Sequence, residues 1–101
     1  MPDTYHQATK PFISAILPVY NEQLNVDGVL QAIHDTGILD EIILVDDGST
    51  DGSLKILNQA VEQDPRMHVI HHERNLGKGQ AIFSGWENSK KWKQCNNILL
   101  K

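Results

Sequence analysis

Short apolar runs alternate with helical patterns along this chain. The run at 13–17, which Pro18 ends, is continuously apolar and predicts a buried strand. Apolar residues then recur with the i, i+3, i+4, i+7 spacing of one helix face, and Gly37 supplies a stop. The residues on this face are Val26, Val29, Leu30 and Ile33.

The alternation repeats in the middle of the chain. The run at 41–45 is again continuously apolar, which is typical of parallel strands covered on both faces. Ser49, Thr50 and Asp51 are favourable residues for a helix start, and Pro65 ends this unit. The helical spacing between them is carried by Leu54, Leu57 and Val61.

A third unit and the start of a fourth follow. Residues 67–71 predict a strand, at a sheet edge because it has polar members, and 97–100 begin a fourth strand. Between them 77–91 predicts a helix, and we expect Trp86 and Trp92 to pack it onto the sheet. One face of this helix is expected to hold Ile82, Gly85 and Trp86.

Strands that alternate with helices and are joined by right-handed crossovers predict an α/β fold, a Rossmann-like parallel sheet with flanking helices. Natural domains seldom end inside a core strand, so we interpret the sequence as truncated. The expected organisation is a polar segment, 1–11, followed by one incomplete domain, 12–101. An uncovered sheet edge favours association, so we also expect self-association through the truncated sheet.

Composition and charge narrow the classes of partner. A chain of 101 residues allows one small domain, and its net charge of −4 argues against nucleic acid or an anionic membrane as the main partner. Cys95 is the single cysteine, which excludes an internal disulfide and fits a reducing compartment. With no signal-peptide pattern at the N-terminus, we predict a cytoplasmic protein whose membrane association, if any, uses parts beyond this segment.

Polar side chains follow the first two predicted strands where each ends. Ligands of open α/β sheets bind beyond the carboxyl ends of the strands. There Tyr20 can offer an aromatic face to a nucleobase, Asp47 can accept a hydrogen bond from a base or a ribose, and Gly48 allows close backbone approach. Each loop alone is equally well a turn followed by a helix cap, but their joint occurrence about 25 residues apart favours a ligand site.

Three segments together carry a family resemblance: Pro18-Val19-Tyr20-Asn21-Glu22, Asp46-Asp47-Gly48-Ser49-Thr50-Asp51-Gly52 and Asn75-Leu76-Gly77-Lys78-Gly79. The chain resembles the opening of family 2 glycosyltransferases, the group that includes dolichyl- and polyprenyl-phosphate sugar synthases. The resemblance implies the N-terminal half of a GT-A fold. It also implies a site for a UDP or GDP sugar, formed by Pro18, Val19, Tyr20, Asn21, Glu22, Asp46, Asp47, Gly48, Gly77 and Lys78.

The resemblance further implies inverting sugar transfer by the intact protein. The family binds Mg²⁺ or Mn²⁺ through an Asp-x-Asp motif after the fourth strand, and this sequence ends at Lys101, before that motif. We therefore expect this segment to hold neither metal ligands nor catalytic residues and to be inactive alone. A non-catalytic nucleotide-binding or regulatory module, and a fragment that binds nothing, remain as alternatives.

Competing motifs fit less well. Residues 47–52 resemble the start of an EF-hand loop, but Asn58 stands where glutamate is required. Gly77-Lys78-Gly79 lacks the earlier glycine and the following Ser or Thr of a phosphate-binding loop. The histidines near the third strand point to different faces, so we interpret them as solvated or edge-strand residues rather than metal ligands. They are His68, His71 and His72.

Overall fold

The computed structural model describes residues 11–90 and contains three strands and three helices in alternation. In chain order they are β1 (Ser14–Val19), α2 (Val26–Asp35), β2 (Glu41–Asp47), α3 (Ser53–Gln63), β3 (Met67–His72) and α4 (Lys78–Asn88). The predicted α/β fold class is thereby confirmed. The expected fourth strand, Trp92 and Cys95 lie outside the described residues.

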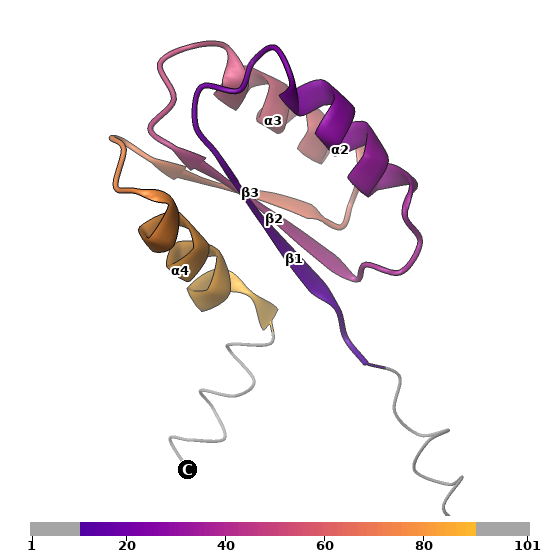
Figure 1. Ribbon diagram of the computed structural model, residues 1–101. Coiled ribbons are helices and arrows are strands. Elements are labelled where there is room, and N and C mark those ends of the chain that lie inside the picture. The colour runs from indigo at the N-terminus through magenta and orange to yellow at the C-terminus, as the bar shows by residue number, and fades with distance from the viewer. Residues whose placement is uncertain (1–10, 91–101) are drawn as a thin grey trace, which may run out of the picture.

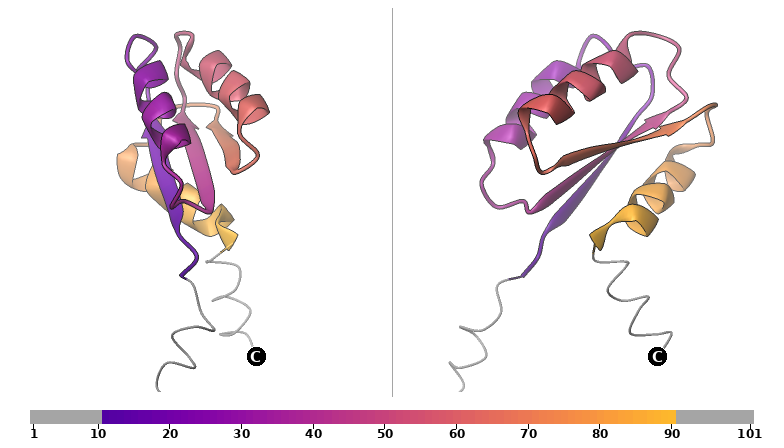
Figure 2. Two further views of the ribbon diagram at one scale, coloured as in Figure 1. Left: turned by 90° about the vertical axis from the view of Figure 1, so that its right-hand side faces the viewer. Right: turned by 180° about the vertical axis from the view of Figure 1, so that it is seen from behind.

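The strands form one parallel sheet in the order β1-β2-β3. In its register Val19 pairs with Asp46, and Asp47 pairs with His72, so the carboxyl ends of all three strands lie at one edge. Helices α2 and α3 cover one face of the sheet and α4 covers the other (Figures 1 and 2). The third strand is at an edge of the described sheet, as predicted.

The core has two layers because the side chains of β2 alternate between the faces of the sheet. Ile42 and Leu44 pack with Leu30 and Leu57 under α2 and α3. On the other face, Ile43 and Val45 form a smaller cluster with α4. All seven residues of β2 are buried, which explains why the residues between Glu41 and its two terminal aspartates are continuously apolar.

One residue of each of two predicted helix faces is exposed in the structure. Val29 on α2 is 43% exposed, and Ile82 on α4 is 44% exposed, so neither joins the core. Gly85 is buried as predicted, but its buried neighbours on α4 are Ala81 and Ser84. A Cβ at Gly85 would lie 2.5 Å from Ile16 Cγ2, which shows that small residues let α4 approach the sheet closely. The apolar spacing alone therefore misplaced this face.

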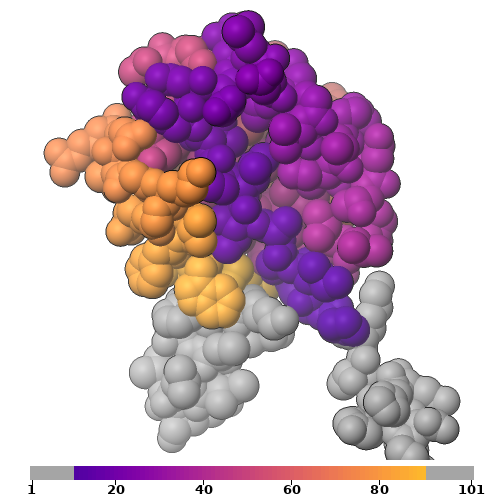
Figure 3. All heavy atoms as spheres, viewed as in Figure 1, coloured from indigo at the N-terminus to yellow at the C-terminus, as the bar shows by residue number. Residues whose placement is uncertain are grey.

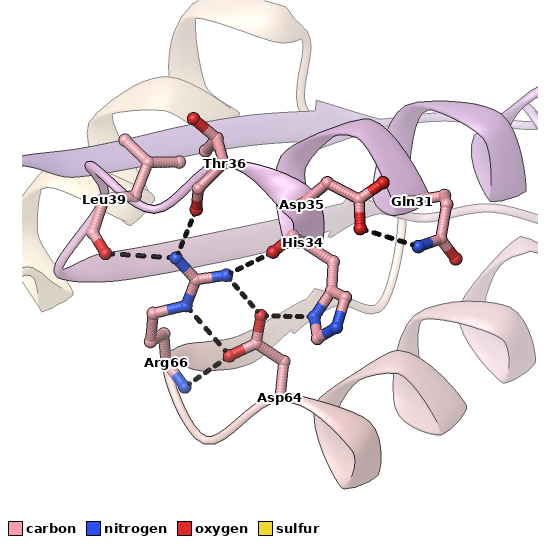
Figure 4. A network of polar contacts seen from close by, with 7 residues as sticks. All are labelled: Gln31, His34, Asp35, Thr36, Leu39, Asp64 and Arg66. Atoms are coloured by element: carbon pink, nitrogen blue, oxygen red, sulfur yellow. Dashed lines mark hydrogen bonds and ion pairs between the residues drawn. The ribbon is translucent and has the colours of Figure 1, made fainter.

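The amino-terminal end of the sheet is closed by a polar network (Figure 4). Arg66 binds the Asp64 carboxylate through Nε at 3.0 Å and Nη2 at 2.7 Å, and Asp64 also contacts His34 Nδ1 at 2.9 Å. The remaining guanidinium donors bind backbone carbonyl oxygens of His34, Thr36 and Leu39. These contacts fasten the end of α2 and the following loop to the start of β3.

Candidate functional site

Three loops meet at the carboxyl edge of the sheet. The first loop (20–25) joins β1 to α2, the second loop (48–52) joins β2 to α3, and the third loop (73–77) joins β3 to α4. They lie together at the upper left of the molecule in Figures 1 and 3. The structure thus brings to one edge the residues that the sequence analysis assigned to a ligand site, which the parallel register requires.

Asn21 fastens the first loop to the second. Its backbone N–H donates to Ser49 Oγ at 3.0 Å, and its side-chain Oδ1 accepts the N–H of Thr50 at 2.8 Å. Asn21 also has a φ of 50°, a left-handed conformation that asparagine tolerates better than most residues. Asn21 therefore holds the first loop against the second through both its backbone and its side chain.

A second set of bonds continues this attachment toward α3. The N–H of Glu22 donates to Ser53 Oγ at 2.9 Å, and Gly52 N–H donates to Gln23 Oε1 at 2.8 Å. Asp51 accepts the N–H of Gln23 at 3.2 Å and that of Ser53 at 2.9 Å. The helix thus begins at Ser53, slightly later than predicted, because the polar residues before it bind the first loop as well as the helix start.

Gly48 is the point at which the second and third loops cross. Its φ is 76°, and a Cβ added there would lie 2.3 Å from the backbone carbon of Arg74 and 2.4 Å from the backbone nitrogen of Asn75. Gly48 was expected from the sequence to permit close backbone approach. The close neighbour in the structure is the third loop.

Asp47 joins the second loop to the third through three hydrogen bonds. Its Oδ1 contacts His72 Nδ1 at 2.9 Å and accepts the N–H of Leu76 at 2.9 Å, while Oδ2 accepts the N–H of Gly77 at 3.0 Å. Burial raises the pKa of this carboxyl, but the bonds from His72, Leu76 and Gly77 outweigh it and hold the pKa below its ordinary value. Asp47 is therefore an ionised acceptor in a fixed orientation.

Asp46, the residue before Asp47, pairs in the same way with His71, the residue before His72. Its Oδ2 lies 2.8 Å from His71 Nδ1, and the residue is fully buried. Its Oδ1 is also buried and has no hydrogen-bond partner among the described residues. A buried carboxylate oxygen without a partner costs free energy, so Asp46 retains acceptor capacity that the described part of the chain leaves unused.

The pairing of His71 and His72 with the two aspartates was not predicted from the sequence. His68 is exposed, as expected, and all three residues lie on the edge strand β3. His71 and His72, however, are the register partners of Asp46 and Asp47. The signal was available, because two acidic residues end the second strand and two histidines end the third, and parallel neighbours place such ends side by side.

Several predicted site residues remain accessible. Tyr20 is 46% exposed, and Glu22 and Lys78 are also exposed. Lys78 begins α4, where the backbone N–H groups of a helix favour anions. A pocket of about 220 Å³ beside the first loop is lined in part by Pro18, Val19 and Glu22. These groups leave room for a ligand at the loop edge.

A larger hollow lies elsewhere. A groove of about 610 Å³ runs between α2 and α3 and is lined by His34, Gln59 and Asp64 among others, but by none of the predicted site residues. We locate the site at the loops, because parallel sheets bind ligands beyond their strand ends and the loops hold the accessible polar groups. Within 11–90 no cluster of three or more His, Cys, Asp or Glu residues could hold a metal ion, and no helix there is long and apolar enough to span a membrane.

The family model described as glycosyl transferase family 2 matches residues 14–91. A glycosyltransferase of Haemophilus influenzae is 36% identical over 81 residues, which are 79% of this chain and 32% of that protein. The undecaprenyl-phosphate 4-deoxy-4-formamido-L-arabinose transferase of Edwardsiella ictaluri is 38% identical over 87 residues, 81% of this chain and 27% of that protein. The chain thus spans about a third or less of the length of these curated relatives.

Solved structures show the same fold. A mannosyltransferase from Pyrobaculum calidifontis in complex with GDP-Man and Mn²⁺ superimposes with a TM-score of 0.70 at 20% identity, over 87% of this chain and 30% of that one. Residues 1–349 of TarS from S. aureus superimpose with a TM-score of 0.64 at 25% identity, over 79% of this chain and 25% of that one. The expected GT-A architecture is thereby confirmed for the described residues.

Proposed function

The chain belongs to glycosyl transferase family 2, and from this premise we propose that it is the part of an inverting glycosyltransferase that binds the nucleotide of a sugar donor. The observation that carries the proposal is the meeting of three loops at the carboxyl edge, with an oriented carboxylate at Asp47 and exposed Tyr20, Glu22 and Lys78 around it. The relatives that share this segment are named as glycosyltransferases, which supports it.

In this proposal the residues divide into those that contact the nucleotide and those that hold the loops. Tyr20 stacks on the base with Pro18 bracing it, and Asp47 accepts a hydrogen from the base or the ribose. A carboxylate offers about four acceptor positions and Asp47 uses three, which leaves one on Oδ2. Lys78 and the start of α4 meet the diphosphate. The supporting residues are Val19, Asn21, Asp46, Gly48 and Gly77.

For the whole protein we propose direct displacement at the anomeric carbon. An acceptor oxygen attacks from the face opposite the diphosphate, its bond to carbon forms as the bond from carbon to the phosphate oxygen breaks, and the nucleoside diphosphate leaves with inversion. A hydroxyl acceptor would pass its proton to a base outside the described residues, whereas an ionised phosphate acceptor has no proton to pass. Mg²⁺ or Mn²⁺ belongs to this proposal for the whole protein only, because residues 11–90 do not supply a ligand set.

The names of the relatives suggest the acceptor. Edwardsiella and Pectobacterium proteins that are 38% and 39% identical to this chain are named as undecaprenyl-phosphate transferases. On that basis the acceptor of the whole protein is a polyprenyl phosphate, and a cytoplasmic catalytic domain would work at a membrane surface. Incubating the whole protein with undecaprenyl phosphate and labelled UDP or GDP sugars tests this, since no labelled lipid product would contradict it.

Amide NMR titration of the 101-residue chain with UDP and GDP, with Mg²⁺ present throughout, tests the binding proposal. We expect shifts at Tyr20, Glu22, Asp47 and Lys78, and we expect one nucleotide to bind more tightly. Gln59 in the distant α2–α3 groove is the internal control and should not shift. A spectrum that neither nucleotide changes would refute binding by this segment, and shifts confined to the groove would place the ligand elsewhere.

Self-association is a separate proposal for this chain. β1 is an edge strand of the described sheet, and no described strand pairs with its outer side, as is typical of edges that favour association. We expect a dimer or larger assembly of the 101-residue chain at high concentration. Light scattering that finds only monomer would contradict this and leave the nucleotide proposal unaffected.

A further inference from the structure

His72 lies between two elements of the site and contacts both with its ring nitrogens. Its Nδ1 is 2.9 Å from Asp47 Oδ1, and its Nε2 is 2.9 Å from Ser84 Oγ on α4. The side chain is only 10% exposed, whereas those of the paired residues His71 and His34 are 44% and 48% exposed. This is the one histidine of residues 11–90 for which both ring nitrogens have a side-chain contact within hydrogen-bonding distance.

The chemistry of the carboxylate fixes the direction of the first bond. An ionised carboxylate only accepts, so Nδ1 carries the proton and donates to Asp47. The Ser84 hydroxyl donates to Nε2 in a neutral ring and accepts from it in a ring that carries both protons, so it can pair with either form. The resulting chain, Ser84 to His72 to Asp47, runs from the buried face of α4 to the end of β2.

Asp47 transmits this constraint to the third loop. The same Oδ1 that faces His72 accepts the N–H of Leu76, and Oδ2 accepts the N–H of Gly77. Gly77 has a φ of 98° and immediately precedes Lys78, the first residue of α4. The rotation of the Asp47 carboxylate therefore contributes to where the loop before Lys78 lies, together with Asn75 Oδ1, which also accepts the Gly77 N–H at 3.0 Å.

We propose that His72 is a positioning residue of the donor site, which holds the Asp47 carboxylate in the orientation that ties the third loop to the second. The consequence of this positioning rests on the proposed function: the free acceptor position of Asp47 and the Lys78 ammonium face the same nucleotide. His72 itself does not touch the ligand. Its effect on binding passes through Asp47 and the loop.

Three variants of the 101-residue chain separate positioning from packing. His72→Phe keeps an aromatic ring but removes both polar contacts. His72→Asn places an amide N–H at the same number of bonds from Cα as Nδ1, so it can still donate to Asp47. His34→Asn is the matched control, because His34 also binds a buried aspartate through Nδ1, but at the opposite end of the sheet.

The first readout needs no ligand. It is the rate of hydrogen exchange of the Leu76 and Gly77 amides, which donate to Asp47. In His72→Phe we expect exchange at these two positions to rise about tenfold or more relative to buried amides of β2, and His72→Asn should restore most of the protection. His34→Asn should leave both positions unchanged.

The second readout is nucleotide affinity by calorimetry with UDP and GDP. We expect His72→Phe to weaken binding of the preferred nucleotide about tenfold, His72→Asn to weaken it about threefold or less, and His34→Asn to leave it within twofold. If His72→Phe does not fold, Ser84→Ala removes only the far contact of the ring and should show the same two changes at smaller size.

The outcomes are distinct. Unchanged exchange at Leu76 and Gly77 in His72→Phe would overturn the inference, as would uniform acceleration in both His72 variants, since that describes a packing residue. Equal affinity of the wild-type and His72→Phe chains would also overturn it. A wild-type chain that binds neither nucleotide counts against the proposed function, and the exchange measurement then still judges the role of His72.

Discussion

Both ends of the sheet hold a buried aspartate, but they stabilise it with different hydrogen-bond donors. Each places a buried aspartate beside a histidine: Asp64 with His34 at the amino end, and Asp47 with His72 at the carboxyl end. At the amino end Arg66 adds a two-point contact with the carboxylate and three contacts with backbone carbonyls. At the carboxyl end the further donors are backbone amides of the third loop.

This difference distinguishes the amino end, which is a structural contact, from the carboxyl end, which is a site with unused hydrogen-bonding capacity. Arginine presents five donors in a rigid fork, enough to satisfy the carboxylate and the surrounding carbonyls. The carboxyl end leaves Asp46 Oδ1 without a partner among the described residues and keeps Tyr20 exposed. Within residues 11–90 every residue with positive φ lies in its loops: Asn21, Gly48 and Gly77. Such conformations persist where surrounding contacts enforce them and often mark functional sites.

Breaking the amino end should have the largest effect on stability. Arg66→Met retains an aliphatic stem but leaves the Asp64 carboxylate, which is 3% exposed, without its main partner. We expect the free energy of unfolding to fall by about 3–5 kcal/mol, as for other buried pairs that lose one member. Urea denaturation followed by circular dichroism measures this.

Lys55→Met on the exposed side of α3 is the control for Arg66→Met, and it should change stability by less than about 0.5 kcal/mol. The fraction of Arg66→Met chains that remain folded should bind nucleotide as the wild type does. A stability loss below about 1 kcal/mol would show that the amino end is an ordinary surface ion pair, and the comparison between the two ends would fail.

A glycine series tests the geometry of the carboxyl end. Gly48→Ala combines positive φ with a backbone clash at Arg74, and we expect it to cost about 2–5 kcal/mol. Gly77→Ala has positive φ but open space around the new methyl group, and should cost about 1–2 kcal/mol. Gly79→Ala, in the helix with neither problem, should be neutral or stabilise by about 0.5–1 kcal/mol.

The same urea titrations measure all three glycine variants. The order of costs matters more than their size, because it separates the conformational cost from the steric one. Equal costs at Gly48 and Gly77 would mean that the third loop moves away freely from the second, and the close crossing of the two loops would then be unimportant for stability.

The sequence predicted the order of elements because β1 and β2 contain apolar runs and each helix has its spacing. It also predicted that the polar segments gather at one edge of the sheet, because each of them follows the end of a strand. It did not predict the whole buried face of α4, because Ser84 and Gly85 are buried through their small size, which lets the helix approach the sheet, and not through hydrophobicity. The Arg66 network was also missed, because it binds carbonyls of His34, Thr36 and Leu39 that no residue pattern identifies. Predicting that His71 and His72 pair with Asp46 and Asp47 requires the register of β2 and β3.

Acid should weaken the amino end through Asp64. Hydrogen bonds from Arg66 hold the pKa of this carboxyl well below its ordinary value of 3.8, despite the opposing effect of burial. A lowered pKa in the folded state means that the stabilisation is present above the unfolded value and is lost as pH falls below about 4 toward the folded value. Asp64→Asn should therefore cost about 1–3 kcal/mol at pH 7 and progressively less in acid.

Urea titrations of wild type and Asp64→Asn between about pH 7 and pH 2 check this, with the exposed Asp27→Asn as the control. We expect the two stability curves to converge in acid, while the control stays parallel to the wild type. Curves of wild type and Asp64→Asn that remain parallel across the range would show that ionisation of Asp64 does not contribute to the joint.

The attachment of the first loop to the second is weaker and can be divided into its parts. Asn21→Gly keeps the left-handed conformation and removes the side-chain bond to Thr50, at an expected cost of about 1 kcal/mol. Asn21→Ala adds the strain of positive φ, about 1 kcal/mol more. Thermal unfolding of the two variants measures the difference, and equal stabilities would show that the first loop relaxes out of the left-handed conformation.

The smallest effect on stability should come from Lys78, an exposed residue whose side chain makes no recorded hydrogen bond or ion pair among the described residues. Lys78→Gln removes a positive charge from the start of α4 without disturbing a bond that the structure records, so stability should change by less than about 0.5 kcal/mol. Affinity for UDP or GDP should fall about three- to tenfold, while affinity for the nucleoside without phosphates should not change.

Calorimetry with nucleotide and nucleoside at two salt concentrations measures both affinities of Lys78→Gln. The loss of nucleotide affinity should shrink at high salt because exposed charges are screened. An equal loss for nucleotide and nucleoside would place Lys78 near the base rather than the diphosphate, and the carboxyl edge would then bind its ligand in the reverse orientation.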